Sequence, residues 1–444
     1  MSSRPRALGP LVALFTAGYL APYLLPTVVG RLSAGLGLSP AQAGLVGSVL
    51  LLASASAGFT LAARVERLGP RRAARIGLGA MCLGYGSAAL TTSVPLVVGG
   101  AVLGGFGSGT ALAVAAAGIA AQRDPHRAST LGLLTVSATA GALYLTLPHL
   151  GSGHGLPFAS IALAAALVWP LTAGLGDGGA PRPSPTPTPA RAEGTPLPHR
   201  RSGLVLAIAI LCWSMAQNAL WGVSGRIGLT QAGLSEVTVG AVFAVALGAG
   251  LAGVTAAGAL GSRLGRAAPI GAGTAIIAVC VLVSSGAESL PAFAAGEVLW
   301  NVFYPVVLSY LLGLAASLDP RGRWAVLVGS ASSLGVACGP VTGSVLSEQL
   351  GYPGMGLLLC ALLLLAAAPM TAVALHTSGR PLVPGSIRRR GGAAAAVLAG
   401  TTGSTPGLVP QMGAPEQPVT EIPVSATPKA TRQSFRLARP SDRG

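Results

Sequence analysis

The sequence is poor in charge. Only 9% of its 444 residues are charged, where a soluble domain carries about 25%. Acidic residues are the scarcest, with 12 Asp and Glu against 28 Lys and Arg. A soluble chain of this length would divide into several cores under a charged surface, but here short charged clusters separate long apolar runs. The composition therefore favours lipid as the solvent of these runs.

The net charge of +16 raises the question of nucleic-acid binding. The sequence contains no basic helix or stripe, because the basic residues lie at the chain start, in short connections and in the tail. This distribution is typical of a membrane topology signal. We therefore expect the lipid bilayer as a partner, and no nucleic acid.

Metal, cofactor and catalytic patterns are absent from the sequence. The five cysteines lie inside apolar runs without the spacing of zinc or iron–sulfur ligands, which predicts small core residues. Neither a nucleophile paired with a base nor a phosphate-binding loop is recognisable. We expect no metal, no cofactor and no enzymatic activity. The cysteines are Cys82, Cys212, Cys280, Cys338 and Cys360.

Twelve segments reach the length of about 20 mostly apolar residues that a membrane helix needs. The runs are continuous rather than alternating, which predicts helices and not a barrel. The first run is too long for a secretory signal. The predicted spans are 8–30, 41–63, 73–92, 95–121, 129–150, 156–175, 203–224, 237–260, 268–286, 291–316, 324–347 and 353–376.

The two halves of the chain repeat one another at a shift of 196 residues. Leu38-Ser39 matches Leu234-Ser235, and Arg67-Leu68-Gly69 matches Arg263-Leu264-Gly265. With a slip of one residue, Gly30-Arg31 matches Gly225-Arg226. Six spans separate the copies, so both have the same orientation in the membrane. The predicted fold class is an all-α membrane protein with two pseudo-symmetric bundles of six helices.

Basic residues also predict the orientation and the domains. With a cytoplasmic amino terminus, only Arg31 and Arg226 lie on the opposite side, so we expect both termini in the cytoplasm. The expected domains are a first bundle at 1–175, a Pro-rich linker at 176–202, a second bundle at 203–377 and a disordered basic tail at 378–444. Arg388 to Arg390 in the tail either touch anionic lipid or are simply solvated.

The loop between spans two and three reads Ala62-Ala63-Arg64-Val65-Glu66-Arg67-Leu68-Gly69-Pro70-Arg71-Arg72. It resembles the major facilitator superfamily signature G-x-L-a-D-R-x-G-R-R, with Ala62 for the first Gly and Glu66 for the Asp. The second copy, Gly258 to Arg266, keeps the glycines and has Ser262 in the acid's place. The resemblance covers about residues 8–377 and implies transport by alternating access.

A charged helix end beside a flexible glycine forms a plausible conformational latch. A carboxylate there can pair with a neighbouring helix end in one conformation and release it in another. The resemblance likewise implies that Glu66, Arg67 and Arg71 stabilise the outward-open state. The alternative is that these are plain topology charges. The predicted latch residues are Glu66, Arg67, Gly69, Arg71, Arg263 and Gly265.

Two departures from the family's proton-coupled exporters stand in the sequence. Ala101 occupies the position of the exporters' span-four arginine. The exporters' G-x-x-x-G-P-x-x-G pattern, typical of span five, occurs here in span eleven as Gly335 to Gly343. Drug–proton antiport therefore does not follow from the resemblance.

The resemblance implies a central cavity lined by spans one, four, seven and ten, and polar and aromatic residues gather in three of these. In span ten they share one helical face, at i, i+3, i+4 and i+7. The aromatic rings either line the cavity or merely pack. The candidates are Glu297, Trp300, Asn301 and Tyr304 in span ten, Trp213, Gln217, Asn218 and Trp221 in span seven, and Tyr19 and Tyr23 in span one.

Glu297 is the only clearly intramembrane carboxylate, and the cost of burying it makes it a functional candidate. It could bind and release a proton, or pair with a cationic substrate. The alternatives are a satisfied interhelical contact or a position nearer the membrane surface. His149 and His154, near the outer end of span five, are expected at an interface, with a role in coupling as the alternative.

The leading hypothesis is a secondary active transporter of a small molecule in the cytoplasmic membrane, with protons as the coupling ion. An apolar, aromatic cavity favours export of an organic compound, whereas uptake of an anionic metabolite would need an intramembrane Arg or Lys. The alternatives are an uptake permease and a non-transporting sensor or assembly protein. The substrate itself is not readable from the fold.

Overall fold

A computed structural model describes residues 8–122, 124–176, 197–261, 264–319 and 322–378, and the backbone of 395–397 and 419–421. Two expected segments, most of the Pro-rich linker and most of the basic tail, lie outside these residues. So do the side chains of Phe59, of residues 61–67 within α3 and of Ser378.

Helices make up the described chain, apart from two short strands that pair antiparallel. The first half contains α1 Leu8–Tyr23, α2 Leu25–Leu36, α3 Pro40–Leu68, α4 Pro70–Leu90, α5 Val94–Ala120, α6 Pro125–Leu150, α7 Gly155–Val168 and the short η2 Pro170–Gly174. The second half contains α8 Arg200–Arg226, the short η3 Ile227–Gln231, α9 Glu236–Leu260, α10 Ala267–Ser285, α11 Leu290–Ser317 and α12 Arg323–Ser378. The strands are β1 Ala395–Val397 and β2 Val419–Glu421.

These helices correspond to the twelve predicted spans. Within the described ranges, nine helices are long and apolar enough to cross a membrane, and α1 and α2, bent by 47°, together make a tenth span. The 56 residues of α12 form two spans that meet at Gly351, whose φ is 69°. α4 completes the twelve and is less apolar because three arginines lie in its first two turns. The predicted fold class is confirmed.

The sequence repeat is also a repeat of backbone geometry. Gly37 and Gly233, 196 positions apart, both have φ of 64°. Gly69 and Gly265, at the same separation, have φ of 81° and 68°. Glycine adopts a positive φ without the clash that a Cβ would cause, so each pair allows a tight turn close to a helix end in both halves.

Small residues hold neighbouring helices together. A Cβ on Gly84 of α4 would lie 2.6 Å from the carbonyl oxygen of Gly100 in α5. A Cβ on Gly107 of α5 would lie 2.5 Å from the carbonyl oxygen of Gly77 in α4. Such close approach of backbones is the usual way for helices to pack in lipid, where apolar burial gives no driving force.

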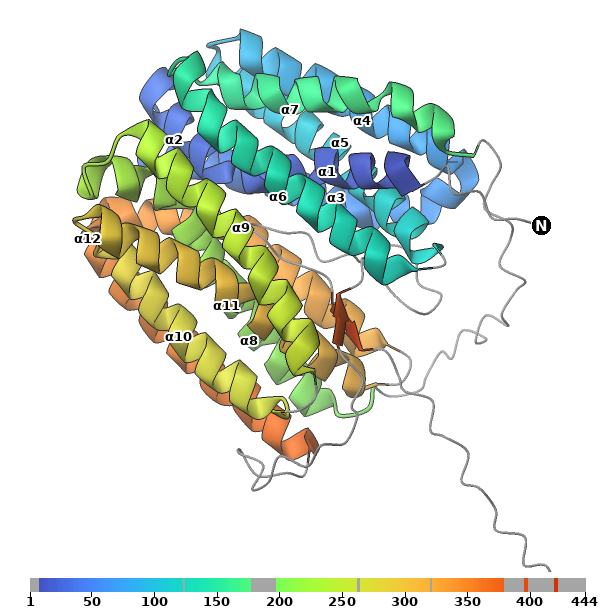
Figure 1. The fold of residues 1–444 in the computed structure, drawn as a ribbon, viewed down its shortest axis with the longest axis vertical. Helices are drawn as coiled ribbons and strands as arrows, with labels where there is room; N and C mark the ends of the chain where they lie inside the picture. Colours follow the sequence, from blue (N-terminus) through green and yellow to red (C-terminus); the bar gives the residue numbers. More distant parts are fainter. Residues whose placement is uncertain are drawn as a thin grey trace, which may run out of the picture.

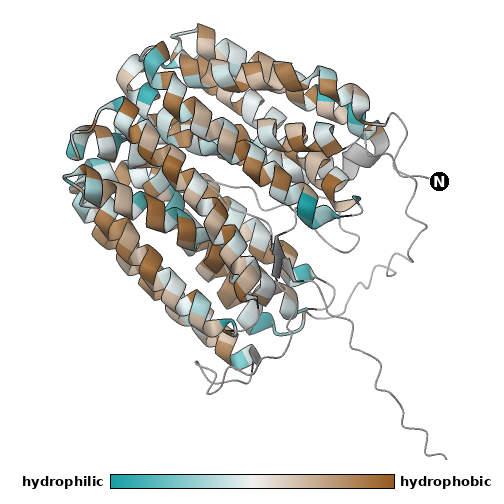
Figure 2. Cartoon of the chain, viewed as in Figure 1, coloured by the Kyte–Doolittle hydropathy of each residue, from teal (hydrophilic) through white to brown (hydrophobic). Residues whose placement is uncertain are grey.

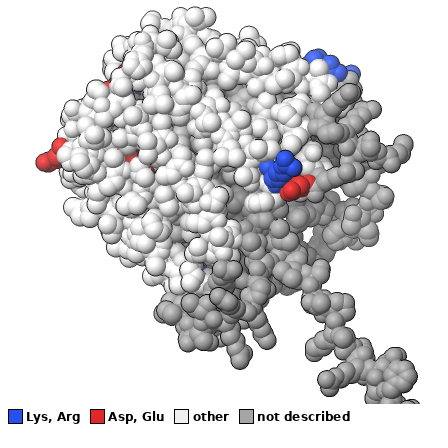
Figure 3. Space-filling view, viewed as in Figure 1, with Lys and Arg blue, Asp and Glu red and all other residues white. Residues whose placement is uncertain are grey.

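The outer surface suits a bilayer. Figure 2 shows hydrophobic residues along the outward faces of the helices. Large apolar side chains such as Leu83, Leu167 and Leu365 are 66 to 72% exposed. In the face seen in Figure 3, charged residues are few and most of the described surface is uncharged. An uncharged belt with charges at its ends is typical of a protein that spans a membrane.

The two halves meet at the end where α2 finishes and α3 begins, called here the Arg31 end. Figure 1 shows the halves close together there and diverging towards the end where α1 begins, with β1 and β2 between them. At the Arg31 end the backbone N–H of Val341 donates to Ser48 Oγ at 2.9 Å, across the halves. The structure is therefore closed at this end.

Candidate functional site

The predicted polar and aromatic residues of α8 and α11 come together inside the protein. These two helices run in opposite directions, so residues from the end of α8 face residues from the start of α11. Trp300 Nε1 donates to Gln217 Oε1 at 2.8 Å, and Trp213 stacks on Tyr304 with ring centroids 5.1 Å apart. Fully buried in this cluster are Trp213, Gln217, Asn218, Trp221, Glu297, Trp300, Asn301 and Tyr304.

Glu297 lies about two helical turns from the start of α11, nearer the Arg31 end than the middle of the span. Ser284 Oγ of α10 lies 2.6 Å from Glu297 Oε1, and Ser224 Oγ of α8 lies 2.8 Å from the same oxygen. Glu297 Oε2 is buried and has no hydrogen-bond partner among the described residues. The carboxyl group is thus an interhelical contact through one oxygen only.

The hydrogen-bonding partners of Glu297 accommodate a carboxyl group with or without its proton. Ser224 Oγ carries one hydrogen and has two acceptors within reach, Glu297 Oε1 and the carbonyl oxygen of Leu220 at 3.0 Å. With the carboxylate charged, Ser224 donates to it. With Oε1 protonated, the acid donates to Ser224 Oγ, which then donates to Leu220. Proton binding therefore requires only the rotation of one hydroxyl group.

Sequence reasoning missed Ser224, Ser284 and the aromatic side chains that surround the site. Phe243 of α9 packs on Trp221 at 5.2 Å between ring centroids and on Phe293 at 6.1 Å. Tyr144 of α6, in the first half, packs on Phe243 at 5.0 Å. Single serines and phenylalanines in apolar helices give no signal in a sequence, because such residues are also common in the core. Only the register between helices identifies them.

Buried polar atoms without partners mark further binding potential. Trp213 Nε1, Asn218 Oδ1 and Asn301 Oδ1 have no hydrogen-bond partner among the described residues. Such groups are rare in folded proteins, since each costs free energy when buried unpaired. Asn218 packs closely against α12. A Cβ on Gly339 of α12 would lie only 2.5 Å from the Cβ of Asn218. The roles of these residues in substrate binding remain predictions.

The two tyrosines of span one lie in the first half and pack there. Tyr19 contacts Phe15 of the same helix, with centroids 4.5 Å apart. Tyr23 is fully buried, and its carbonyl oxygen accepts a hydrogen bond from Tyr144 Oη at 2.6 Å. Tyr23 Oη is buried without a hydrogen-bond partner among the described residues, and whether these two side chains line the cavity or merely pack stays a prediction.

The predicted latch is only partly described. Arg263 and the side chains of Glu66 and Arg67 lie outside the described residues. Gly69 and Gly265 have the positive φ values that a tight turn at a helix end requires, and the Arg71 side chain is half-buried at the start of α4. The glycine geometry is thus in place in both copies, while the ion pairing stays a prediction.

The two histidines lie near the Arg31 end. His154 precedes α7, and its Nε2 lies 2.9 Å from the carbonyl oxygen of Thr91. His149 lies in the last turn of α6 and is exposed. The His154 contact holds a loop to a helix end, in agreement with the interface interpretation.

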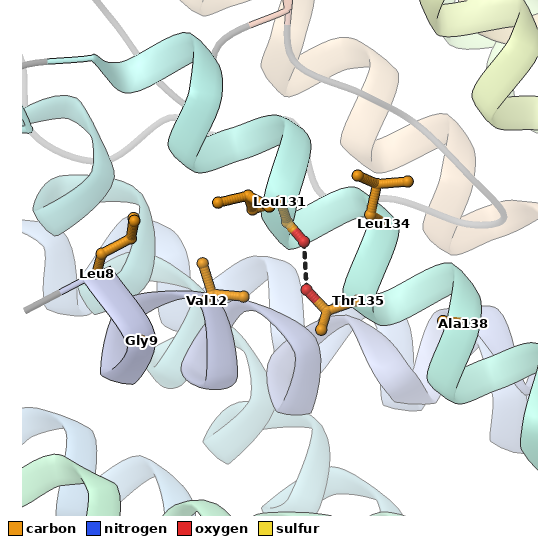
Figure 4. Close-up of a pocket in the computed structure, with 7 residues that line it drawn as sticks. All are labelled: Leu8, Gly9, Val12, Leu131, Leu134, Thr135 and Ala138. Carbon is orange, nitrogen blue, oxygen red and sulfur yellow. Dashed lines mark hydrogen bonds between the residues drawn. The ribbon is translucent and has the colours of Figure 1, made fainter.

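A separate apolar cavity of about 460 Å³ lies between α1 and α6 (Figure 4). Its one side-chain hydroxyl, on Thr135, donates to the carbonyl oxygen of Leu131 within α6. A binding site usually combines an apolar surface with a few polar groups that orient the ligand, and this cavity offers none free. Its lining residues are Leu8, Gly9, Val12, Leu131, Leu134, Thr135 and Ala138.

Two bundles of six helices with a parallel repeat, an uncharged outer surface and a buried polar cluster define a multi-pass membrane protein with transporter architecture. Residues 8–323 match the model of the Major Facilitator Superfamily, and the chain belongs to this family of membrane transporters. No curated protein matches the chain.

Two solved structures share the fold. The human organic anion transporter MFSD10 (TETRAN) aligns with a TM-score of 0.58 and 19% identity, over 83% of this chain and all of that one. The POT family transporter PepTSo aligns with a TM-score of 0.64 and 14% identity, over 86% of this chain and all of that one. At these identities the likeness concerns the fold alone.

Proposed function

We propose that this protein is a secondary active transporter that exports a small organic molecule across the cytoplasmic membrane, coupled to protons. The observation that carries the proposal is the fully buried carboxyl group of Glu297. One of its oxygens has no hydrogen-bond partner in the described part of the chain, and Ser224 can bond to the group in either protonation state. Burying an ionisable group within a membrane span costs free energy, which makes such a group a functional candidate.

The way in which the halves meet supports alternating access. Ion-pair and hydrogen-bond contacts join them at the Arg31 end, and they diverge at the other end (Figure 1). If both termini are cytoplasmic, as the distribution of basic residues predicts, this conformation opens to the cytoplasm. The latch residues at the turns of Gly69 and Gly265 would then act in the opposite conformation.

The chemistry of the site favours an uncharged or cationic organic substrate. Three tryptophans, a tyrosine and two amide oxygens without a hydrogen-bond partner among the described residues lie in the same buried cluster as Glu297. Aromatic faces and a carboxylate attract cations and apolar rings, but they repel anions. Arg31, in the middle of α2, pairs with Glu236, and Arg226, the last residue of α8, donates to Ser344, so neither is directed to this cluster.

Flux measurements in everted membrane vesicles test the proposal. A panel of organic cations and neutral aromatic compounds should show uptake into vesicles that depends on an imposed proton gradient. Glu297→Gln keeps the shape of the side chain but cannot exchange a proton, so it should abolish gradient-driven flux. Glu288→Gln, at an exposed position nine residues away, is the matched control and should leave the flux unchanged.

If the Glu297→Gln variant shows the same gradient-driven flux as the protein that keeps Glu297, the assignment of Glu297 as the coupling residue is wrong. Inward flux in right-side-out vesicles would instead indicate an uptake permease. No flux of any compound, with the protein folded in the membrane, would favour a non-transporting sensor or assembly protein.

A further inference from the structure

The first membrane span is broken at its centre in a way that leaves a carbonyl group free. α1 ends at Tyr23 and α2 begins at Leu25, with a bend of 47° between them. Pro26, the second residue of α2, has no N–H group, so the carbonyl oxygen of Pro22 four residues earlier cannot accept the usual helical hydrogen bond. Within a membrane such an oxygen needs another donor.

The donor comes from the other half of the protein. Trp221 Nε1 of α8 donates to the carbonyl oxygen of Pro22 at 3.2 Å, and both atoms are buried. Trp221 itself is fully buried, with Phe243 and Trp300 against its ring. The bond thus joins a side chain of the second half to a backbone defect in the first.

This bond lies in the surface that closes the Arg31 end. One turn further along α8, a Cβ on Gly225 would lie 3.1 Å from the carbonyl oxygen of Pro26. A Cβ on Gly30 would lie 4.0 Å from Arg226 Cγ. α2 and the end of α8 are therefore in direct contact, and the halves cannot part at this end without breaking the bond between Trp221 and Pro22.

We propose that Trp221 is a positioning residue of the transport cycle: its indole N–H pairs with the carbonyl that Pro26 leaves free only while the Arg31 end is closed, and so favours the closed conformation. When the halves part, water reaches the Pro22 carbonyl and replaces the indole. Without the indole N–H, the carbonyl oxygen of Pro22 has no donor in the closed conformation, whereas water still reaches it in the open one. The closed conformation is thereby destabilised, and the population shifts towards the open one. This inference rests on the proposed alternating access.

A cysteine at Ser48 reports the parting of the halves. Ser48 is 7% exposed, and its hydroxyl accepts the N–H of Val341 across the halves at 2.9 Å. In a chain with Ser48→Cys and the five native cysteines replaced, the rate of maleimide labelling of purified protein measures the open fraction at this end. Trp221→Phe, which keeps the ring and removes the N–H, should raise this rate about tenfold.

The decisive comparison repeats Trp221→Phe in a Pro26→Ala background. Alanine restores the N–H within the helix, so the Pro22 carbonyl is paired in both conformations and the indole is no longer needed. Trp221→Phe should then change the labelling rate less than twofold. An equal rise in both backgrounds, or no rise in the chain that keeps Pro26, would overturn the proposal.

Trp324→Phe is the matched control. Trp324 Nε1 donates to the carbonyl oxygen of Pro198 at 2.7 Å, the same kind of bond but within the second half. Removing this bond should leave the rate of Ser48→Cys labelling unchanged. A rise as large as that expected for Trp221→Phe would overturn the proposal. Labelling is measured without transport, so it tests this inference separately from the proposed function. If the effect of Trp221→Phe depends on Pro26 but the protein transports none of the compounds, the proposed function is wrong and the conformational role of Trp221 stands.

Discussion

Arg31 of α2 and Glu236 of α9 form an ion pair across the two halves, with Arg31 Nη2 and Glu236 Oε1 2.7 Å apart. Arg31 is 5% exposed, and its Nη2 also donates to the carbonyl oxygen of Leu147 in its own half at 3.1 Å. Arg226, the counterpart of Arg31 in the repeat, donates instead to Ser344 Oγ within the second half at 3.0 Å. The duplicated arginines therefore have different partners, and one of them ties the halves together.

Breaking this ion pair should open the Arg31 end. Arg31→Gln or Glu236→Gln should each raise the Ser48→Cys labelling rate about tenfold, because each leaves a partly desolvated charge without its partner. The double change, Arg31→Gln with Glu236→Gln, should raise the rate little further than either single change, because the same pair is already broken. Additive effects of the two single changes would show that the residues do not act as a pair.

Gly84 should tolerate no side chain. A Cβ there meets backbone atoms of α5, including the carbonyl oxygen of Gly100 at 2.6 Å, and backbone cannot move aside as a side chain can. Gly84→Ala should lower stability by about 1–3 kcal/mol. Gly86→Ala, in the same helix with nothing within 4 Å of its Cβ, should leave thermal unfolding in detergent unchanged or slightly stabilised. Equal melting temperatures for the two variants would contradict this packing.

Gly69 and Gly265 should be equally sensitive to a Cβ, since both have a left-handed backbone at equivalent positions. Alanine at either should cost about 1–2 kcal/mol in thermal unfolding. If the turn at Gly69 belongs to the latch, Gly69→Ala should also slow flux beyond what its lost stability explains. Gly265→Ala is the comparison, because the second copy of the loop has Ser262 where the first has Glu66. A change there should lower stability without the additional effect on flux.

Trp213 should show a split between stability and binding. Its indole N–H has no hydrogen-bond partner among the described residues, while its ring stacks on Tyr304. Trp213→Phe keeps an aromatic ring and removes an unpaired donor, so the melting temperature should change by only a few degrees. The apparent KM for a transported compound should rise severalfold if the substrate accepts that hydrogen bond. A large fall in melting temperature with unchanged KM would assign Trp213 to packing alone.

The sequence by itself determined the solvent, the number of spans and the duplication. Lipid demands continuous apolar runs, and a repeat at 196 residues predicts the same turns twice, as Gly37 and Gly233 show. It also predicted that residues such as Glu297 and Trp300 share a helical face, because that depends only on spacing within one helix.

The tertiary structure alone decided which side chains meet from different helices. Ser224 and Ser284 have no distinguishing pattern, yet both reach Glu297 Oε1 because α8, α10 and α11 pack in one particular register. The pairing of Arg31 with Glu236, and of Trp221 with the Pro22 carbonyl, likewise depends on how the two halves rest against each other. Local spacing along a chain carries no information on that contact, since it arises only when both bundles have folded and met.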